Sequence, residues 1–202
     1  MLPRLLIRCW ASALMLCCWL NAAAAPTPIE VLRTHIAKSI EVLQDPRYHD
    51  PAQATAQRER LCAIGREVFD PYLFAKLALG THWSAFSHAE KTTFVDVFAD
   101  YLCRYYLSRL QQRYRDEQVE FMGQRFDGDT RARVTAQVLW QDTRIPVEIP
   151  MALREGRWRA YDLVLLGVSA VKVYRSQFGD ALSHDSPARL IAQLRAKTAR
   201  NE

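Results

Sequence analysis

The sequence has little glycine and, beyond its amino end, no long apolar run. Only seven glycines occur in 202 residues, which argues against a loop-rich binding scaffold. There is no low-complexity stretch, no internal repeat and no long basic block, and no later segment approaches the roughly 20 apolar residues that cross a bilayer as a helix. The chain after the amino end therefore has the size of one domain with a substantial core.

The amino end has the features of a cleavable signal peptide. Arg4 and Arg8 give it a positive start, residues 9–20 are apolar and uncharged, and four alanines follow. The apolar stretch is too short to span a bilayer, for which roughly 20 residues are needed. We therefore predict a signal peptide of residues 1–24, export to the periplasm, and a single mature domain of residues 25–202.

Removal of that segment would change the charge and the cysteine content. The formal net charge would fall from +5 to +3, with 25 basic and 22 acidic residues remaining. This mild excess slightly favours anionic lipid head groups over nucleic acid as a partner. Cys62 and Cys103 remain and could form one disulfide in an oxidising compartment. Because each lies in an apolar helical pattern, we favour two buried, unpaired thiols.

The pattern of apolar residues predicts an α+β fold, with a helical first half, a strand-rich middle and a helical tail. Apolar residues spaced three and four apart indicate helices at residues 28–43, 54–68, 71–79, 168–178 and 187–197. The Ser87-Glu90 capping box indicates the start of a further, longer helix. Strict alternation indicates four strands of an antiparallel meander with one apolar face, at residues 118–126, 131–140, 145–153 and 157–166. Two prolines in the third strand, Pro146 and Pro150, place it at an edge or give it bulges.

No residue pattern indicates catalysis or metal binding. The five histidines are scattered without ligand spacing. Ser169 follows Gly167 as in a hydrolase nucleophile elbow, but the motif is incomplete, and a helix cap is the favoured interpretation. Asp162 and Arg175 are interpreted as members of a structural ion pair. We therefore predict no catalytic residue, no metal and no cofactor.

Several short motifs together resemble the MlaC family of toluene-tolerance proteins. Their order and spacing match from residue 69 to about residue 194, and the motifs are Phe69-Asp70, Leu79-Gly80-Thr81-His82-Trp83, the aromatic stretch 94–106, Gly156-Arg157-Trp158-Arg159-Ala160-Tyr161-Asp162 and Tyr174-Arg175-Ser176-Gln177-Phe178. The resemblance implies a monomeric periplasmic carrier with phospholipid as its cargo. It also implies exchange of lipid between an outer-membrane lipoprotein complex and an inner-membrane ABC transporter complex with an MCE-type subunit, which maintains the lipid asymmetry of the outer membrane.

The implied site is an apolar lipid pocket between the meander and the long helix. We expect its lining to come from one face of the sheet and from the facing helices, namely Phe94, Phe98, Tyr105, Val134, Val138, Val147, Ile149, Leu163, Leu165 and Phe178. Tyr106 and Arg175 are expected near the mouth, where a polar tip can meet a phosphate. Three alternative functions stay open. The protein could carry hopanoid or another isoprenoid lipid, or it could be a protein-interaction module with a solid core. It could also be a hydrolase or acyltransferase that uses Ser169 with Asp162 and a histidine.

Overall fold

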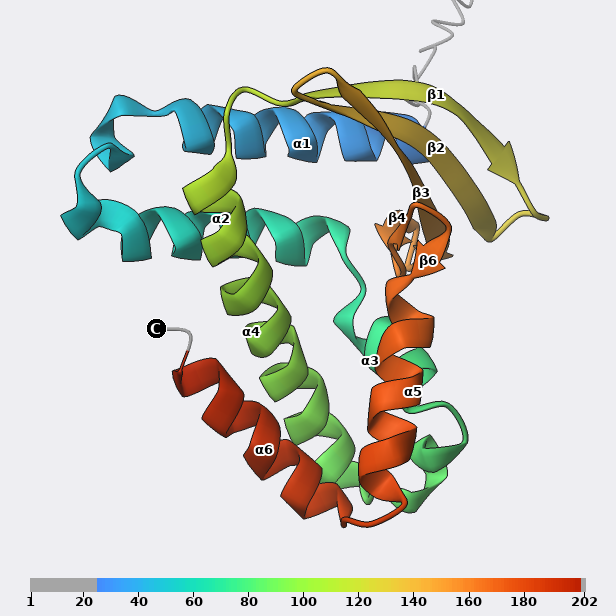
Figure 1. Cartoon of the computed structure of the whole chain (residues 1–202). Coiled ribbons are helices and arrows are strands. Elements are labelled where there is room, and N and C mark those ends of the chain that lie inside the picture. Colours follow the sequence, from blue (N-terminus) through green and yellow to red (C-terminus); the bar gives the residue numbers. More distant parts are fainter. Residues whose placement is uncertain (1–24, 201–202) are drawn as a thin grey trace, which may run out of the picture.

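The computed structural model describes residues 25–200 and arranges them in a lower helical lobe and an upper lobe with a twisted antiparallel sheet (Figure 1). The predicted signal peptide lies outside the described residues. The helices are α1 (Pro28–Gln44), α2 (Ala54–Val68), α3 (Pro71–Leu79), α4 (His88–Arg113), α5 (Ala170–Leu182) and α6 (Pro187–Ala199), with short 3-10 turns at Pro46–Tyr48, Pro51–Gln53 and Gly80–Ala85. The strands are β1 (Gln118–Phe126), β2 (Arg131–Trp140), β3 (Thr143–Arg154), β4 (Arg157–Ala160), β5 (Val164–Leu165) and β6 (Val168–Ser169).

Within residues 25–200, five of the six helices begin at the predicted residue, whereas α5 begins at Ala170 instead of residue 168. In every helix but α2, a short polar side chain caps the free backbone N–H groups at the start. Asp70 accepts from the amide of Leu73 at the start of α3, with a proline in the first helical position. Ser87 and Glu90 form the predicted capping box of α4. The predicted α+β fold class is confirmed by this order of helices and strands.

The sheet differs from the predicted meander in its fourth strand. Strands β1, β2 and β3 pair in sequence, and the other side of β3 pairs with both β4 and β5, while β6 pairs with β5. The expectation of an edge position for β3 is therefore wrong. Pro146 and Pro150 lack N–H donors, and their carbonyl groups instead accept from Leu166 and Tyr161 on the outer side of β3. The predicted fourth strand is interrupted beside these prolines and is divided into β4 and β5, so the prolines of β3 coincide with a break in the strand next to it.

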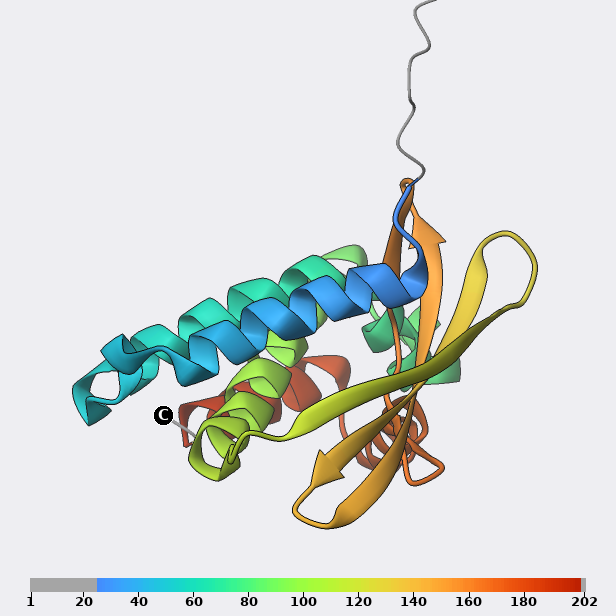
Figure 2. The ribbon, with the colours of Figure 1, turned by 90° about the horizontal axis from the view of Figure 1, so that it is seen from above.

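The buried side chains form two clusters. The helical core joins α3, α4, α5 and α6 around the rings of Phe74, Phe94, Phe98 and Phe178. The sheet core packs Leu32 of α1 against the inner face of the sheet, and its other members are Val134, Ala136, Val147, Ile149, Met151 and Ala160. Figure 2 shows α1 and α2 running side by side away from the sheet, so they cover only part of its inner face.

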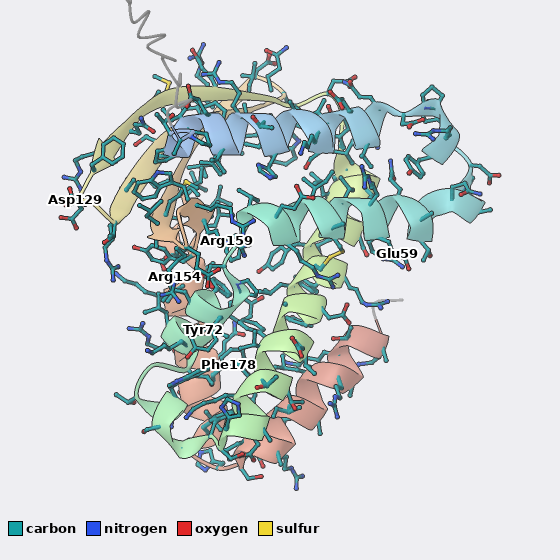
Figure 3. All side chains as sticks on the ribbon, turned by 180° about the vertical axis from the view of Figure 1, so that it is seen from behind. Glu59, Tyr72, Asp129, Arg154, Arg159 and Phe178 are labelled. Carbon is teal, nitrogen blue, oxygen red and sulfur yellow. A yellow bond between two sulfur atoms is a disulfide. The ribbon has the colours of Figure 1, made fainter. Side chains whose placement is uncertain are left out.

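A disulfide joins Cys62 of α2 to Cys103 of α4, and it appears as the yellow bond between these helices in Figure 3. The two Cα atoms lie 5.7 Å apart, within the usual range for a disulfide. The interpretation as two unpaired buried thiols is therefore wrong. Each cysteine does lie in an apolar helical pattern, but the packing of α2 against α4 brings the two together.

Gly80 ends α3 with a backbone conformation that only glycine adopts readily, at φ +56° and ψ −124°. A Cβ atom at this position would also lie 3.3 Å from the side chain of Arg175. Arg175 is held there because its Nε donates to the carbonyl oxygen of Leu77 at 2.9 Å, in the last turn of α3.

Gly80→Ala is expected to lower the free energy of unfolding by about 1–3 kcal/mol, through backbone strain and the close approach of Arg175. Gly65 is the matched control, since it lies inside α2 with open space around it. Gly65→Ala should instead raise stability by about 0.5–1 kcal/mol. Guanidinium unfolding of both variants measures the difference, and equal effects of one sign would contradict the account of Gly80.

Replacing both cysteines with alanine is expected to lower the free energy of unfolding by about 4 kcal/mol, because the disulfide closes a loop of 41 residues. Guanidinium unfolding of the variant and of the unreduced protein measures this loss. Thiol labelling of the denatured, unreduced protein is the control. Labelling of Cys62 and Cys103 in that sample would show that the disulfide is absent.

Candidate functional site

Helix α4 has fully buried side chains in its first half, and only half-buried or exposed ones in its second half. Phe94 and Phe98 are 0% and 1% exposed in the helical core. From residue 99 to residue 113 no side chain is buried, although this half carries Tyr101, Leu102, Tyr105, Tyr106 and Leu110. An apolar surface on a helix needs a partner, either protein or ligand.

On the inner face of the sheet, the burial of side chains also decreases along the strands. Val134 and Ala136 are buried under α1, but Val138, one step further along β2, is only half-buried. Its cross-strand neighbours Val119 and Ile145 are half-buried as well. The covered part of the inner face therefore ends before the turn between β2 and β3.

These two surfaces lie on consecutive elements, because a short loop joins the end of α4 at Arg113 to the start of β1 at Gln118 (Figure 1). Leu165 of β5, opposite Val147, lies beside them on the sheet and is 44% exposed. We name the set the α4–sheet surface, and it consists of Leu102, Tyr105, Tyr106, Val119, Val138 and Leu165. Its side chains are aliphatic or aromatic, so the surface suits an apolar ligand.

A cluster of tyrosines connects α4 to α5 at this surface. Tyr101 stacks on Tyr105 with ring centroids 5.5 Å apart, and Tyr105 meets Tyr106 edge to face at 5.0 Å. The hydroxyl groups of Tyr106 and Tyr174 share a hydrogen bond of 3.1 Å. Burial, together with the Tyr106 hydroxyl, raises the pKa of Tyr174 above its ordinary value. Tyr174 therefore keeps an uncharged hydroxyl group, which can donate to an oxygen acceptor.

The structure divides the predicted lining residues among separate places. Phe94, Phe98 and Phe178 belong to the closed helical core, and Figure 3 shows Phe178 among the lower helices. Val134, Val147 and Ile149 belong to the sheet core. The α4–sheet surface contains the remaining members Tyr105, Tyr106, Val138 and Leu165.

Two predicted residues lie elsewhere. Leu163 is exposed at the turn before β5. Arg175 caps the carboxyl end of α3, where its guanidinium binds a backbone carbonyl. The role of these residues and of the other predicted lining residues in lipid binding stays a prediction. Sequence reasoning did not single out Tyr174 as a site residue, although it begins the Tyr174–Phe178 motif, and its contact with Tyr106 depends on the packing of α5.

Two hollows in the described part of the chain are lined mainly by polar residues. One has a volume of about 440 Å³ and is lined by Ser108, Arg109, Gln112, Arg113 and Arg200. Another, of about 180 Å³, lies beside the turn between β2 and β3 and is lined by residues 115–118 and 139–141. Neither has the mostly apolar lining of a lipid pocket.

Ser169 and Asp162 form a cap at the start of α5. The Ser169 hydroxyl donates to Asp162 at 2.6 Å and accepts from the amide of Lys172 at 3.1 Å. Asp162 also accepts from the amides of Leu163 and Val171, so its charge is balanced by backbone donors near a helix amino end. The expected ion pair with Arg175 is therefore wrong, while the expected cap by Ser169 is confirmed.

Residues 25–200 contain no group of three or more His, Cys, Asp and Glu side chains that could hold a metal ion. Within the same range, no helix combines the length and the apolar character needed to cross a membrane.

Comparison with known proteins identifies relatives of this chain. Residues 33–196 match the family model described as MlaC protein. The fold is similar to that of the phospholipid-binding protein from Ralstonia solanacearum, solved in complex with a phospholipid, with a TM-score of 0.72 and 19% sequence identity. The match covers 85% of this chain and 96% of the other chain, so the two share their overall fold.

Ser169→Ala is expected to lower the free energy of unfolding by about 1 kcal/mol through loss of the cap, with no effect on phospholipid chemistry. Ser186→Ala is the matched control, because Ser186 caps α6 by accepting from the amide of Arg189. Thermal unfolding and analysis of incubated phospholipid by mass spectrometry measure both effects. Fatty acid release that only Ser169→Ala abolishes would instead identify a hydrolase.

Proposed function

Because the chain belongs to the MlaC family, we propose that it is a periplasmic carrier of phospholipid. The observation that carries this proposal is the set of half-buried and exposed apolar side chains on the second half of α4 and at the end of the inner face of the sheet. The shared fold with a protein whose structure contains a phospholipid supports the choice of ligand. The amino-terminal segment, with the features of a signal peptide, supports the location.

In the proposed complex the acyl chains lie against the α4–sheet surface. Burying two chains of roughly 16 carbons at ~0.8 kcal/mol per methylene amounts to about 25 kcal/mol before any cost is subtracted. That sum exceeds what noncovalent complexes realise, because opening the protein and ordering the chains offset part of it. The remaining free energy would still hold the lipid through purification.

Uptake requires the helical core and the sheet core to separate locally. Residues 99–113 of α4 are the part that can accept chains with the least loss of packing, because none of them is buried. The hydrogen bond between Tyr106 and Tyr174 crosses from α4 to α5 at this place, so it would break or exchange when lipid enters. The head group would stay in water near these hydroxyl groups, in the position that we propose for the mouth.

The proposed carrier acts as a monomer between two membrane complexes. Its partners would be an outer-membrane lipoprotein complex and an inner-membrane ABC transporter complex with an MCE-type subunit, and the exchange would maintain the lipid asymmetry of the outer membrane. No covalent step is needed, since the lipid enters and leaves unchanged. Release would depend on a partner that opens the α4–sheet surface.

Native mass spectrometry of protein purified from a bacterial periplasm without detergent tests the proposal. A discrete adduct with the mass of a phospholipid is the expected result, and lipid extraction identifies its head group and chain number. A clean mass of the protein alone, with no lipid taken up from liposomes, would support the interaction module instead.

Val138→Asp is expected to remove most of the bound lipid, because a carboxylate would replace an apolar contact on the inner face of β2. Leu139→Asp is the matched control, since the next residue of a strand points to the opposite face. Both side chains are partly exposed, so both variants should fold. Native mass spectrometry compares the adducts, and circular dichroism checks the fold. Equal lipid occupancy in the two folded variants would contradict the proposed surface.

A further inference from the structure

Two short segments of the chain are rich in basic residues, although Arg104 and Arg189 within them pair with the flanking Asp100 and Asp185. Residues 101–115 and 186–200 together contain eight basic side chains and no acidic one. The chain as a whole has a formal net charge of only +5. These two segments are the second half of α4 and the whole of α6 with their flanking residues.

The fold places these segments next to each other. Helix α6 packs along α4, with the carboxyl end of α6 beside the upper half of α4 (Figure 1). The hollow of about 440 Å³ described above lies between them. Its lining includes the three arginines Arg109, Arg113 and Arg200, which we name the arginine face. Segments far apart in sequence thus form one cationic surface.

Helix dipoles do not account for this charge. Arginine near a helix carboxyl end stabilises the helix, and each such end is equivalent to roughly −0.5 charge. Two helix ends beside three guanidinium groups leave about +2 uncompensated. Within residues 25–200, no member of the arginine face forms an ion pair with a carboxylate. Glu202 lies outside the described residues.

The surroundings of the arginine face are apolar, and they border the α4–sheet surface. Arg109 lies over the ring of Tyr105 at 3.5 Å from its centroid and donates to the Tyr105 carbonyl oxygen at 3.0 Å. Leu110 and Tyr106, on the same half of α4, are 40% and 50% exposed. Arginines interspersed with exposed aliphatic and aromatic side chains are typical of a helix that lies at a membrane interface.

We propose that the arginine face docks the protein on bilayers that contain anionic phospholipid. The guanidinium groups would bind the head-group phosphates, while the exposed side chain of Leu110 reaches the boundary of the acyl region. The proposal rests on the proposed carrier function, because docking would bring the α4–sheet surface close to the membrane from which lipid is taken. An acidic protein surface is less suited, since it offers no apolar layer for this exposed side chain.

Co-sedimentation with vesicles tests the docking. We expect the protein to bind vesicles of phosphatidylcholine mixed with phosphatidylglycerol and not to bind vesicles of phosphatidylcholine alone. Binding to the mixed vesicles should be lost at high salt. The triple variant Arg109→Gln, Arg113→Gln, Arg200→Gln should reduce the partition coefficient about a hundredfold, because each basic residue near an anionic surface contributes about fivefold.

A second triple variant, Arg60→Gln, Arg125→Gln, Arg157→Gln, is the matched control, since it removes the same charge from exposed positions elsewhere. It should keep most of the binding. Equal losses of vesicle binding in the two variants would show a general effect of charge. Wild-type protein that does not bind vesicles with phosphatidylglycerol would show that the arginine face does not dock on membranes. Both results overturn the proposal.

Native mass spectrometry on the same preparations separates this proposal from the carrier function. Both triple variants should retain the phospholipid adduct. Loss of the adduct only in the Arg109, Arg113 and Arg200 variant would place these residues in the cargo site and overturn the docking role. Absence of the adduct from every sample, including wild type, would contradict the carrier function while the vesicle result stands independently.

Discussion

The packing of Phe94 and Phe98 in the helical core is the interaction on which the rest of the structure depends. Their rings contact each other and Phe178 with centroids 5.0 to 5.5 Å apart. This packing fixes the first half of α4, and an α-helix of 26 residues is a rod of about 39 Å. The second half must therefore project beyond the helical core, toward the sheet and α2. The position of the uncovered apolar surface follows from this geometry.

The second half of α4 is held in place without burial of its own side chains. The Cys62–Cys103 disulfide ties it to α2, and α2 packs beside α1, which covers the sheet core. A covalent link restrains the helix but leaves its apolar side chains available. In a carrier this division is useful, because side chains fully buried against protein would have to be released before a lipid could replace them.

Charge and apolar surface come together on the same part of α4. Its second half carries the tyrosine cluster, which contacts α5 through Tyr174, and it also packs against α6 beside the arginine face. Arg109 lies between the two, over the ring of Tyr105. The proposed cargo surface and the proposed membrane surface are thus neighbours, although they use different chemistry and can be tested separately.

The sequence by itself determined the local structure of this protein. Caps such as Asp70 and Ser87, the alternation along β2, and the turn residues act over a few positions, so they can be recognised without the fold. The ordered motifs also identified the family. Of the predicted site residues, Tyr105, Tyr106, Val138 and Leu165 lie on the α4–sheet surface, and their role in lipid binding stays a prediction.

Only the tertiary structure decided which elements meet. Apolar spacing shows that Phe94 and Val134 are buried but not that they belong to different cores, because each core is formed by segments far apart in the chain. The disulfide and the contact between Tyr106 and Tyr174 have the same origin. The prolines of β3 likewise interrupt a neighbouring strand that folds against them. Local chemistry sets the elements, and packing between distant segments places the site.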